Sequence, residues 1–561
     1  MKNAITLIII TECDQGKFSL ARFYQRRIAR IFPVSFLVLI VTLIVASIIY
    51  TPQDFASVGT TAIAATLSIA NLKMMMQGNY FEAVPDAQPL LHYWSLSIEE
   101  QFYLVIPSLI LIAFKFKTSR YNLFRITIVI AAISFIGCCI LTEIKPTWAF
   151  YLLPTRAWEL LVGCALALFP FRENGQKNLT FVKILAHLGL LIIFISLFTI
   201  HESTSFPGSI AIFPVIGSIL VLFASNTNKP EGTIRFLSHP YMVFIGKISY
   251  SLYLWHWPIF CFVDYYFYSH SLLIRAILKI IFTCLLSLIS YNFFENPIRT
   301  YLNKPKRKMM SFIIFLAFIG LITFAGFVIR NENYLDASTN SVKNGGIVVN
   351  SYLSKPSIVL MGDSNGSMYG RMLKEISREM KLRAHIISVA GSDALPGQEL
   401  YRDSISFLNQ EKPDITIFVE SWTAKIGQKK ELLPIALSEI LQSSKNIILI
   451  TQPPILPKSA NRSYIRNFGQ FPIVENISTF KLRKKINAYL MSQQNNRIHV
   501  LNIEPMFVQS NGEIRFTDEY GHQLYHDSGH LSGYGSDIVK KQIKSEIKKI
   551  LLSSYSKNSN L

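Results

Sequence analysis

Long apolar runs fill residues 1–330, and short polar loops separate them. Nine of these runs are long and apolar enough to predict membrane-spanning helices. They cover residues 31–50, 102–116, 124–142, 157–170, 183–200, 209–225, 245–264, 272–292 and 311–329. A tenth run, residues 57–72, is diluted by Gly, Thr, Ser and Asn, so the hydrophobic pattern alone leaves its crossing open.

The pattern changes after residue 330. Residues 331–355 are rich in Asn, Ser, Gly and Lys, a composition typical of a linker. In residues 356–561, short strand-like and longer helix-like segments alternate, which predicts a parallel sheet covered by helices. The predicted strands are residues 357–361, 385–389, 415–419, 446–450 and 498–502, and the predicted helices are residues 368–381, 430–441, 478–491 and 534–551.

Composition supports a membrane protein. Half of the 561 residues are hydrophobic, and the mean hydropathy of +0.33 excludes an ordinary soluble protein. The net charge of +20 does not indicate nucleic-acid binding, because much of the basic charge flanks the apolar runs. All six cysteines lie in residues 1–330 and none has metal-site spacing, so we expect no metal site and no disulfide in the soluble half.

Loops rich in Lys and Arg alternate along the chain with loops that contain neither. Lys and Arg are concentrated in residues 22–30, 115–125, 172–183, 229–247 and 299–308, whereas residues 201–208 and 264–271 contain neither. The positive-inside rule fits this alternation if residues 57–72 do not cross the membrane. Residues 331–561 then lie outside the cytoplasm, in a bacterial periplasm. The alternative is ten crossings with a cytoplasmic C-terminal domain. That topology would place the most basic loops outside the cytoplasm, against the positive-inside rule.

Candidate chemistry is clearest in the soluble half. Ser364 follows a strand-like run and a tight turn, and Asp527-Ser528-Gly529-His530 precedes the closing helix. A serine nucleophile needs a base, and a carboxylate fixes the tautomer of that base. Because the carboxyl ends of parallel strands meet at one sheet edge, we predict a Ser364–His530–Asp527 triad. The predicted oxyanion donors are the backbone amides of Ser364 and Gly391. An ordinary turn at Gly362-Asp363-Ser364 is the alternative.

Three arginines precede the first long apolar run. On a helix, Arg26, Arg27 and Arg30 share a face. Arginine forks there suit phosphates bidentately, which predicts a donor-binding site. Anchoring of the helix beside lipid headgroups explains the same residues, and the spacing leaves both interpretations open.

Five ionisable residues are further candidates in the membrane half. Glu99 and Glu100 stand at the outer entry of one predicted span, Arg156 and Glu159 at the start of another, and His256 lies where Trp255-His256-Trp257-Pro258 interrupts a third. Ionisable groups inside a membrane are costly and often functional. A structural ion pair between Arg156 and Glu159, and an interfacial belt of Trp residues, are the alternatives.

Several of these segments together resemble the membrane acyltransferase family 3 fused to a C-terminal SGNH-hydrolase-like domain. The matching segments are residues 18–33, 92–103, 152–163, 246–258 and 294–299. The resemblance implies a multi-span helical membrane domain (1–330), a linker (331–355) and a periplasmic α/β domain with a flavodoxin-like parallel sheet (356–561).

The resemblance also implies a function. Such proteins transfer O-acyl groups, usually acetyl, to bacterial envelope glycans such as lipopolysaccharide O-antigen or peptidoglycan, or to a lipid-linked precursor. The donor is a cytoplasmic acyl-CoA, no cofactor stays bound, and the enzyme lies in the inner membrane. Arg27 and Arg30 would hold the donor phosphates, and Ser364 would be the last acyl carrier.

The chain departs from the family pattern in three places. The match begins near Ile5, so the family's first helix, with its essential histidine, and most of the second are not in this sequence. Asn365 stands where fused members commonly have His, and Ser421-Trp422 stands where a Gly-x-Asn-Asp block would fall. Two alternatives therefore stay open: a membrane-anchored periplasmic carbohydrate acetylesterase, and an inactive truncated remnant.

Overall fold

A computed structural model describes residues 5–77, 88–169, 179–201, 204–225, 231–268, 270–427, 429–457 and 472–558. Parts of the predicted loops 172–183, 201–208 and 229–247 lie outside these residues. The chain divides into two compact units, which we treat separately. The first comprises Met1–Ile44, Thr60–Val263 and Arg275–Gly326, and the second Val45–Gly59, Asp264–Ile274 and Phe327–Leu561.

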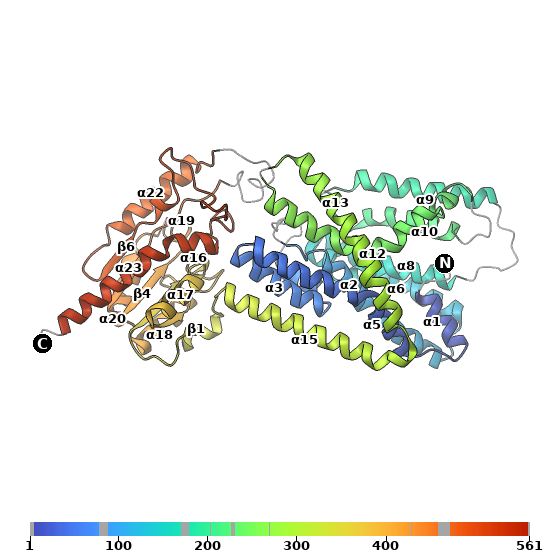
Figure 1. Cartoon of the computed structure of the whole chain (residues 1–561), viewed down its shortest axis with the longest axis horizontal. Helices are drawn as coiled ribbons and strands as arrows, with labels where there is room; N and C mark the ends of the chain where they lie inside the picture. The colour runs from blue at the N-terminus through green and yellow to red at the C-terminus, as the bar shows by residue number, and fades with distance from the viewer. Residues whose placement is uncertain are drawn as a thin grey trace. The chain divides into compact units, whose positions relative to one another are not determined.

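Helices account for nearly all regular structure before residue 334 (Figure 1). They are α1 (Ile5–Asp14), α2 (Leu20–Ile49), α3 (Pro52–Thr66), α4 (Ala70–Gln77), α5 (Tyr93–Lys115), α6 (Arg120–Ile144), α7 (Pro146–Tyr151), α8 (Leu153–Leu168), α9 (Leu179–Thr199), α10 (Ile212–Ala224), α11 (Thr233–Leu237), α12 (Pro240–Tyr266), α13 (Leu272–Ser290), α14 (Asn296–Leu302) and α15 (Lys308–Asn333).

Among the described residues, six helical segments are long and apolar enough to cross a membrane. They overlap six of the nine predicted spans and correspond to α2, α5, α6, α9, α13 and α15. The other three predicted spans are also helices, but α8 and α10 are short, with 16 and 13 residues, and α12 is rich in Tyr and Trp. Residues 57–72 are divided between α3 and α4, and neither is among the six.

Large apolar side chains remain exposed on these helices. Ile133, Leu197 and Phe324 are 65%, 72% and 68% exposed. In water such a surface would be strongly unfavourable, whereas hydrocarbon solvates it well. Together with the six apolar helices, these faces indicate a multi-pass membrane protein.

The predicted interruption at residues 255–258 is wrong. The helix α12 runs unbroken from Pro240 to Tyr266 with Pro258 inside it. Proline removes one backbone donor and leaves the carbonyl of Leu254 without its usual helical partner. A packed helical bundle tolerates that loss.

The second unit contains a six-stranded sheet in the order β1-β3-β2-β4-β5-β6. Its strands are β1 (Ile347–Val349), β2 (Ser357–Gly362), β3 (Arg383–Ile386), β4 (Ile415–Val419), β5 (Asn446–Ile450) and β6 (Ile498–Leu501). All neighbouring pairs are parallel except β1 and β3. The five parallel strands correspond to the predicted ones, although β3 begins two residues and ends three residues earlier than the predicted strand 385–389. Their order is flavodoxin-like. The edge strand β1 was not predicted, because it lies in the segment interpreted as a linker.

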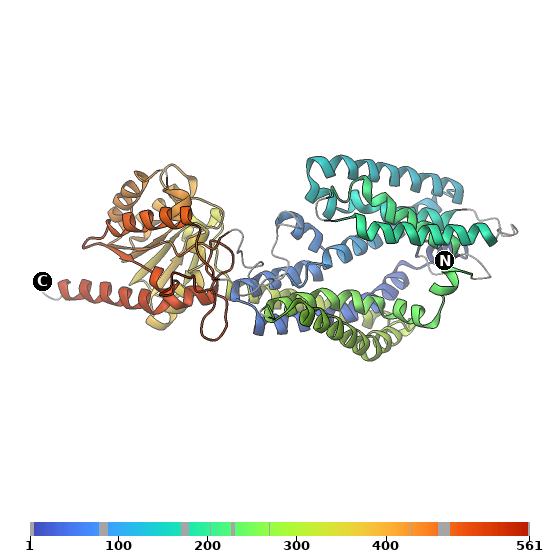
Figure 2. The same cartoon turned by 90° about the horizontal axis from the view of Figure 1, so that it is seen from above.

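Helices cover both faces of the sheet (Figures 1 and 2). They are α16 (Ser364–Ser367), α17 (Gly370–Met380), α18 (Glu399–Glu411), α19 (Trp422–Lys425), α20 (Leu432–Ser443), α22 (Ile477–Met491) and α23 (Gly533–Asn558). Residues of β2 alternate between two cores: Ile358 and Leu360 pack in one, Val359 and Met361 in the other. β2 is buried on both faces, which accounts for its continuous apolar run from Ile358 to Met361.

Candidate functional site

The nucleophile turn begins where β2 ends. Gly362 has φ +154°, and a Cβ there would lie 1.7 Å from the carbonyl oxygen of Val419, so only glycine fits. Asp363 then caps α16: its Oδ1 accepts the backbone N–H of Asn365 at 2.8 Å. Its Oδ2 accepts the N–H of Ser421 at 3.0 Å. These contacts hold Ser364 as the first residue of α16, at the switch point between β3-β2 and β4.

The structure brings the three predicted triad residues together. His530 Nε2 lies 2.8 Å from Ser364 Oγ. Its Nδ1 lies 2.7 Å from Asp527 Oδ2. Asp527 Oδ1 also accepts the backbone N–H groups of Gly529 and His530, at 2.8 and 2.9 Å. The serine, the base and the orienting carboxylate thus form one hydrogen-bonded chain, which is the arrangement that activates a serine hydroxyl.

The interaction between the two side chains favours ionised Asp527 and protonated His530. Burial opposes ionisation of Asp527, but its hydrogen bond to His530 and the charge of that ring outweigh burial and lower the pKa of Asp527 to about 2. Burial likewise lowers the pKa of His530, but the hydrogen bond and charge of Asp527 outweigh it and raise that pKa above its usual value. A carboxylate that holds the imidazole in this way makes His530 a stronger base.

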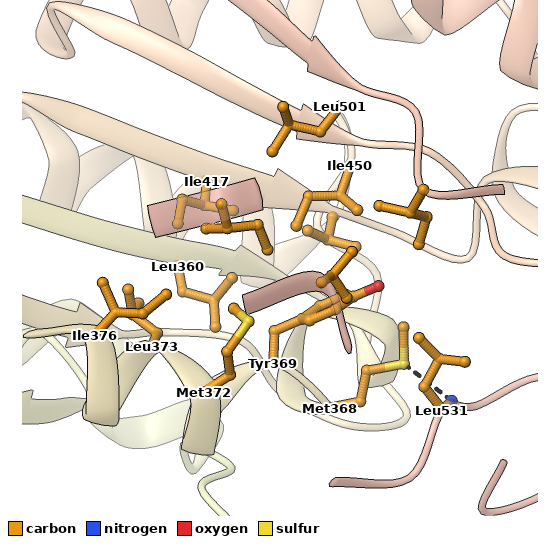
Figure 3. Close-up of a cluster of buried hydrophobic side chains, with 14 of the residues drawn as sticks. Leu360, Met368, Tyr369, Met372, Leu373, Ile376, Ile417, Ile450, Leu501 and Leu531 are labelled. Atoms are coloured by element: carbon orange, nitrogen blue, oxygen red, sulfur yellow. Dashed lines mark hydrogen bonds between the residues drawn. The ribbon is translucent and has the colours of Figure 1, made fainter. Parts of the chain in front are cut away.

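A core contact ties the histidine loop to the nucleophile helix. The backbone N–H of Leu531 donates to Met368 Sδ at 3.3 Å. Figure 3 shows this bond at the edge of the buried cluster, with Tyr369 beside Met368. Leu531 and Tyr369 are fully buried. Packing therefore fixes the chain on both sides of the Ser364–His530 contact, although Leu531 and Met368 are 163 residues apart.

The predicted oxyanion turn lies next to Ser364 in the sheet. Val389 N donates to Gly362 O at 3.1 Å, so the turn that follows β3 stands beside the nucleophile turn. Gly391 in this turn has φ +77°, a conformation that favours glycine. The preceding amide, that of Ala390, is engaged by Asp336 Oδ1 at 2.8 Å. The donor roles of the Ser364 and Gly391 amides stay predictions.

The Trp422 side chain does not supply a donor in place of the Gly-x-Asn-Asp block. Trp422 is fully buried, and its Nε1 donates to Ile450 O at 2.8 Å. Ser421 contributes its backbone N–H, which holds Asp363. This segment thus supports the nucleophile turn through the backbone.

Sequence reasoning assigned no role to Glu420, which follows the third predicted strand and lies behind the nucleophile turn. Glu420 is buried, and its Oε1 accepts the N–H of Ala394 at 3.1 Å. Burial, and then the charges of Asp363 and Asp393, raise the pKa of Glu420 well above its usual value, which favours its protonated form. The signal in the sequence was an acidic residue directly after a buried strand.

In the first unit, the three predicted donor-site arginines line one pocket of about 510 Å³. Lys247, Tyr250, Glu295 and Arg299 line it as well, and sequence reasoning had not assigned them. The only sequence feature that pointed to these four residues was their position in the matching segments 246–258 and 294–299. Glu295 belongs to a π-helical segment, Tyr291–Glu295, and such segments often occur at functional sites.

The three arginines differ in their other contacts. Arg26 pairs with Glu12 at 2.9 Å. The Arg27 guanidinium lies over the Tyr103 ring, 4.3 Å from its centre. It is also close enough to Glu99 and Glu100 to be attracted by their charges. Arg26 is therefore partly neutralised, and Arg27 bridges the pocket to the carboxylates of α5.

The remaining membrane candidates do not line this pocket among the residues that the structure describes. Arg156 Nε pairs with Glu159 Oε1 at 3.0 Å. Its guanidinium stands over the rings of three aromatic residues, Trp94, Phe150 and Phe206. His256 Nδ1 lies 2.5 Å from Tyr253 O, and its ring centre lies 5.5 Å from that of His92. These contacts suit the structural alternative for Arg156 and Glu159 as well as a functional one.

Family comparison agrees with this two-part architecture. An acyltransferase-domain family matches residues 14–292, and a family of SGNH domains fused to such acyltransferases matches residues 336–545. An uncharacterised protein of Haemophilus influenzae is 34% identical over 233 residues, which cover 40% of this chain and 95% of that protein. The chain belongs to the acyltransferase-3 family with a fused SGNH domain. The SGNH match includes Ser364, Asp527 and His530.

Two relatives of this family have named activities. The peptidoglycan O-acetyltransferase OatA of Listeria monocytogenes is 27% identical over 368 residues, which cover 60% of this chain and 58% of that protein. The O-acetyltransferase OatA of Staphylococcus aureus is 30% identical over 307 residues, which cover 53% and 50%. The chain thus spans about half the length of these two relatives.

One solved structure is similar to part of the chain. It is the periplasmic domain of a lipopolysaccharide acetyltransferase from Salmonella ser. Paratyphi A, 18% identical with a TM-score of 0.29. The similarity covers 37% of this chain and 87% of that one.

Proposed function

We propose that this protein transfers an O-acyl group, most simply acetyl, from a cytoplasmic acyl-CoA to a hydroxyl of a cell-envelope glycan. The observation that carries the proposal is the hydrogen-bonded Ser364–His530–Asp527 chain in a protein of the acyltransferase-3 family. The acceptor is peptidoglycan, lipopolysaccharide O-antigen or a lipid-linked precursor. The membrane is the bacterial inner membrane, with residues 331–561 in the periplasm.

The soluble site would carry out the second half of the transfer. Ser364 Oγ attacks the carbonyl carbon of the incoming acyl group while His530 Nε2 takes the hydroxyl proton. The backbone amides of Ser364 and Gly391 stabilise the negative oxygen that develops. His530 gives its proton to the leaving group, and Ser364 remains acylated. A sugar hydroxyl then attacks the acyl-serine, His530 takes that proton, and it returns the proton to Ser364 Oγ.

The membrane half would bind the donor. Lys247 and Arg299 line the same pocket as Arg26, Arg27 and Arg30. Five cationic side chains therefore line a cavity of about 510 Å³. Acyl-CoA carries several phosphates, and guanidinium forks bind phosphate bidentately. Glu295 also lines the pocket and pairs with Arg299 at 3.6 Å, and Arg26 pairs with Glu12, so Arg27, Arg30 and Lys247 would be the main contacts of the donor phosphates.

A membrane-anchored acetylesterase is the second candidate, and the same triad favours it. Water instead of a sugar hydroxyl would then attack the acyl-serine. The test is to purify the full chain and its Ser364→Ala variant, supply acetyl-CoA and glycan, and measure acetyl groups on the glycan. We expect Ser364→Ala to abolish transfer without unfolding the domain. Net loss of acetyl from pre-acetylated glycan by the wild type, with no gain from acetyl-CoA, would instead establish the esterase.

Orientation has its own test. A C-terminal alkaline phosphatase fusion should be active and a C-terminal green fluorescent protein fusion dark, because the first enzyme matures only outside the cytoplasm. The reverse pattern would place residues 331–561 in the cytoplasm and remove the basis for periplasmic transfer.

A further inference from the structure

A second cavity, separate from the serine, lies within the second unit. It is a groove of about 530 Å³ between the chain segment 330–336, the edge strand β1 with the residues that follow it, and helix α17. Its volume is in the range of small-molecule sites. None of its lining residues belongs to the triad.

The lining combines aromatic faces with positive charge. Tyr334 and Tyr352 line the groove, and Tyr352 is 81% exposed. Arg330, Lys374 and Arg378 supply three cationic groups. Aromatic rings pack against the C–H faces of sugars, and guanidinium groups pair with carboxylates.

Two carboxylates belong to the same neighbourhood. Asp336 lines the groove, but its Oδ1 accepts the Ser367 hydroxyl at 2.6 Å and the Ala390 N–H at 2.8 Å. Glu332 pairs with Lys374 at 2.6 Å and lies 4.0 Å from Arg378. The three cations therefore exceed the charge of the two carboxylates by one, and an incoming anion would compete with Glu332 for Lys374 and Arg378.

One end of the groove reaches the catalytic neighbourhood. Asp336 joins α16, which begins with Ser364, to Ala390, the residue before Gly391. Tyr334 belongs to the same end: burial, then the charge of Asp336 and, more weakly, that of Asp527 raise the pKa of the Tyr334 hydroxyl. A ligand in the groove would thus extend toward the acylated serine.

We propose that this groove binds an acidic, carboxylate-bearing sugar of the acceptor glycan, next to the sugar whose hydroxyl is acylated. Tyr334 and Tyr352 contact the ring, and Arg330 and Arg378 bind its carboxylate. The assignment rests on the proposed function, because it presumes that the acceptor is a glycan. It narrows the acceptor to glycans in which an acidic sugar neighbours the acetylated position.

The experiment uses the full chain in detergent and two probes that differ only in charge. One probe is the disaccharide of N-acetylglucosamine and N-acetylmuramic acid, and the other is its methyl ester. We expect calorimetric titration to show at least about tenfold tighter binding of the acid, because only the acid can accept charge-assisted hydrogen bonds from Arg330 and Arg378. Equal binding of acid and ester would overturn the proposal.

Variants with opposite expected effects separate binding from damage to the fold. Arg378→Gln and Arg330→Gln should remove the preference for the acid, whereas Glu332→Gln should tighten binding of the acid about threefold by releasing Lys374 and Arg378. Arg402→Gln, at an exposed position on α18, is the matched control and should bind like the wild type. Weaker binding by Glu332→Gln, or equal loss in Arg402→Gln, would contradict the assignment.

Two further measurements distinguish a sugar acid from a lipid headgroup, and separate failure of this assignment from failure of the proposed function. Soluble dihexanoyl phosphatidylglycerol should compete poorly with the sugar acid, and stronger binding of this lipid would reassign the groove to a lipid headgroup. Ser364→Ala should bind the sugar acid like the wild type and lose transfer. If Ser364→Ala kept transfer activity, the proposed function would fail while the binding result stood.

Discussion

Replacing Asp527 by Asn tests the triad most sharply, because the surrounding hydrogen bonds dictate how the amide must orient. Asp527 Oδ1 accepts two backbone N–H groups, those of Gly529 and His530. Only the carbonyl oxygen of an asparagine can replace that atom. The NH₂ group then occupies the Oδ2 position and faces His530 Nδ1, which lies 2.7 Å from Oδ2 in the wild type. This orientation favours the tautomer with the proton on Nε2, where the ring can no longer accept the proton of Ser364. A proton on Nδ1 could be donated only to Oδ1, which lies 2.9 Å away and already accepts the two backbone N–H groups.

The magnitude follows from the cost of the opposite orientation. Flipping the amide leaves both backbone N–H groups facing an NH₂ group, at about 1–3 kcal/mol for each lost hydrogen bond. The productive orientation is therefore about 2–6 kcal/mol less favourable, which corresponds to a loss of roughly thirtyfold to 10⁴-fold. Loss of the carboxylate charge that stabilises the imidazolium adds to this. We expect kcat for acetyl-ester hydrolysis to fall by at least about 10³-fold, with KM little changed.

The chain contains a matched control. Asp518 Oδ1 accepts the backbone N–H groups of Tyr520 and His522, and Asp518 Oδ2 lies 2.8 Å from His522 Nδ1. Asp518→Asn therefore makes the same local change without a serine partner. Hydrolysis of 4-nitrophenyl acetate by the full chain in detergent, with thermal unfolding measured in parallel, compares the two variants. Folded Asp527→Asn within tenfold of wild-type activity, or an equal loss in Asp518→Asn, would refute the tautomer argument.

Four other predictions concern the triad, the arginine pocket and the Gly391 turn. Because Asp527 raises the pKa of His530 and only the neutral ring accepts a proton, ester hydrolysis should increase with pH through a midpoint above 6.5 and then level off; a midpoint below 6.5 would contradict the pairing. The ionised Asp527 stabilises the fold above pH 4, and this contribution should disappear as the pH falls toward 2, so acid unfolding of the wild type and Asp527→Asn should converge there. Arg30→Lys should lose most transfer activity at normal protein levels because lysine lacks the planar fork, whereas full activity would favour headgroup anchoring. Gly391→Ala should lower kcat, while Gly397→Ala, which also has a positive φ and open space around it, should cost similar stability, about 1–2 kcal/mol, and keep activity; equal activity of the two variants would exclude a role for the Gly391 turn.

Local sequence patterns were sufficient to predict much of the structure of this protein. Continuous apolar runs identify both the membrane helices and the buried strands, because each position that is shielded from water favours an apolar residue. The five parallel strands and the separation of Ser364 from Asp527-x-x-His530 were enough to predict one sheet edge with a triad, because parallel strands end together. The two-part family architecture also followed from segments that can be identified locally.

Other features depend on contacts between distant segments, which no local pattern records. The edge strand β1 forms because Ile347–Val349 pairs with β3, although its own composition resembles a linker. Pro258 was expected to break a helix that the surrounding bundle keeps continuous. The buried Glu420 beside Asp363, the convergence of Lys247 and Arg299 on the arginine pocket, and the groove between residues 330–336 and α17 all bring together residues from separate elements. Local sequence specifies the kinds of element and the reactive groups, whereas the packing of distant segments brings particular charges together. The reason is that electrostatic and hydrogen-bond energies depend on distances in space and not on separation along the chain.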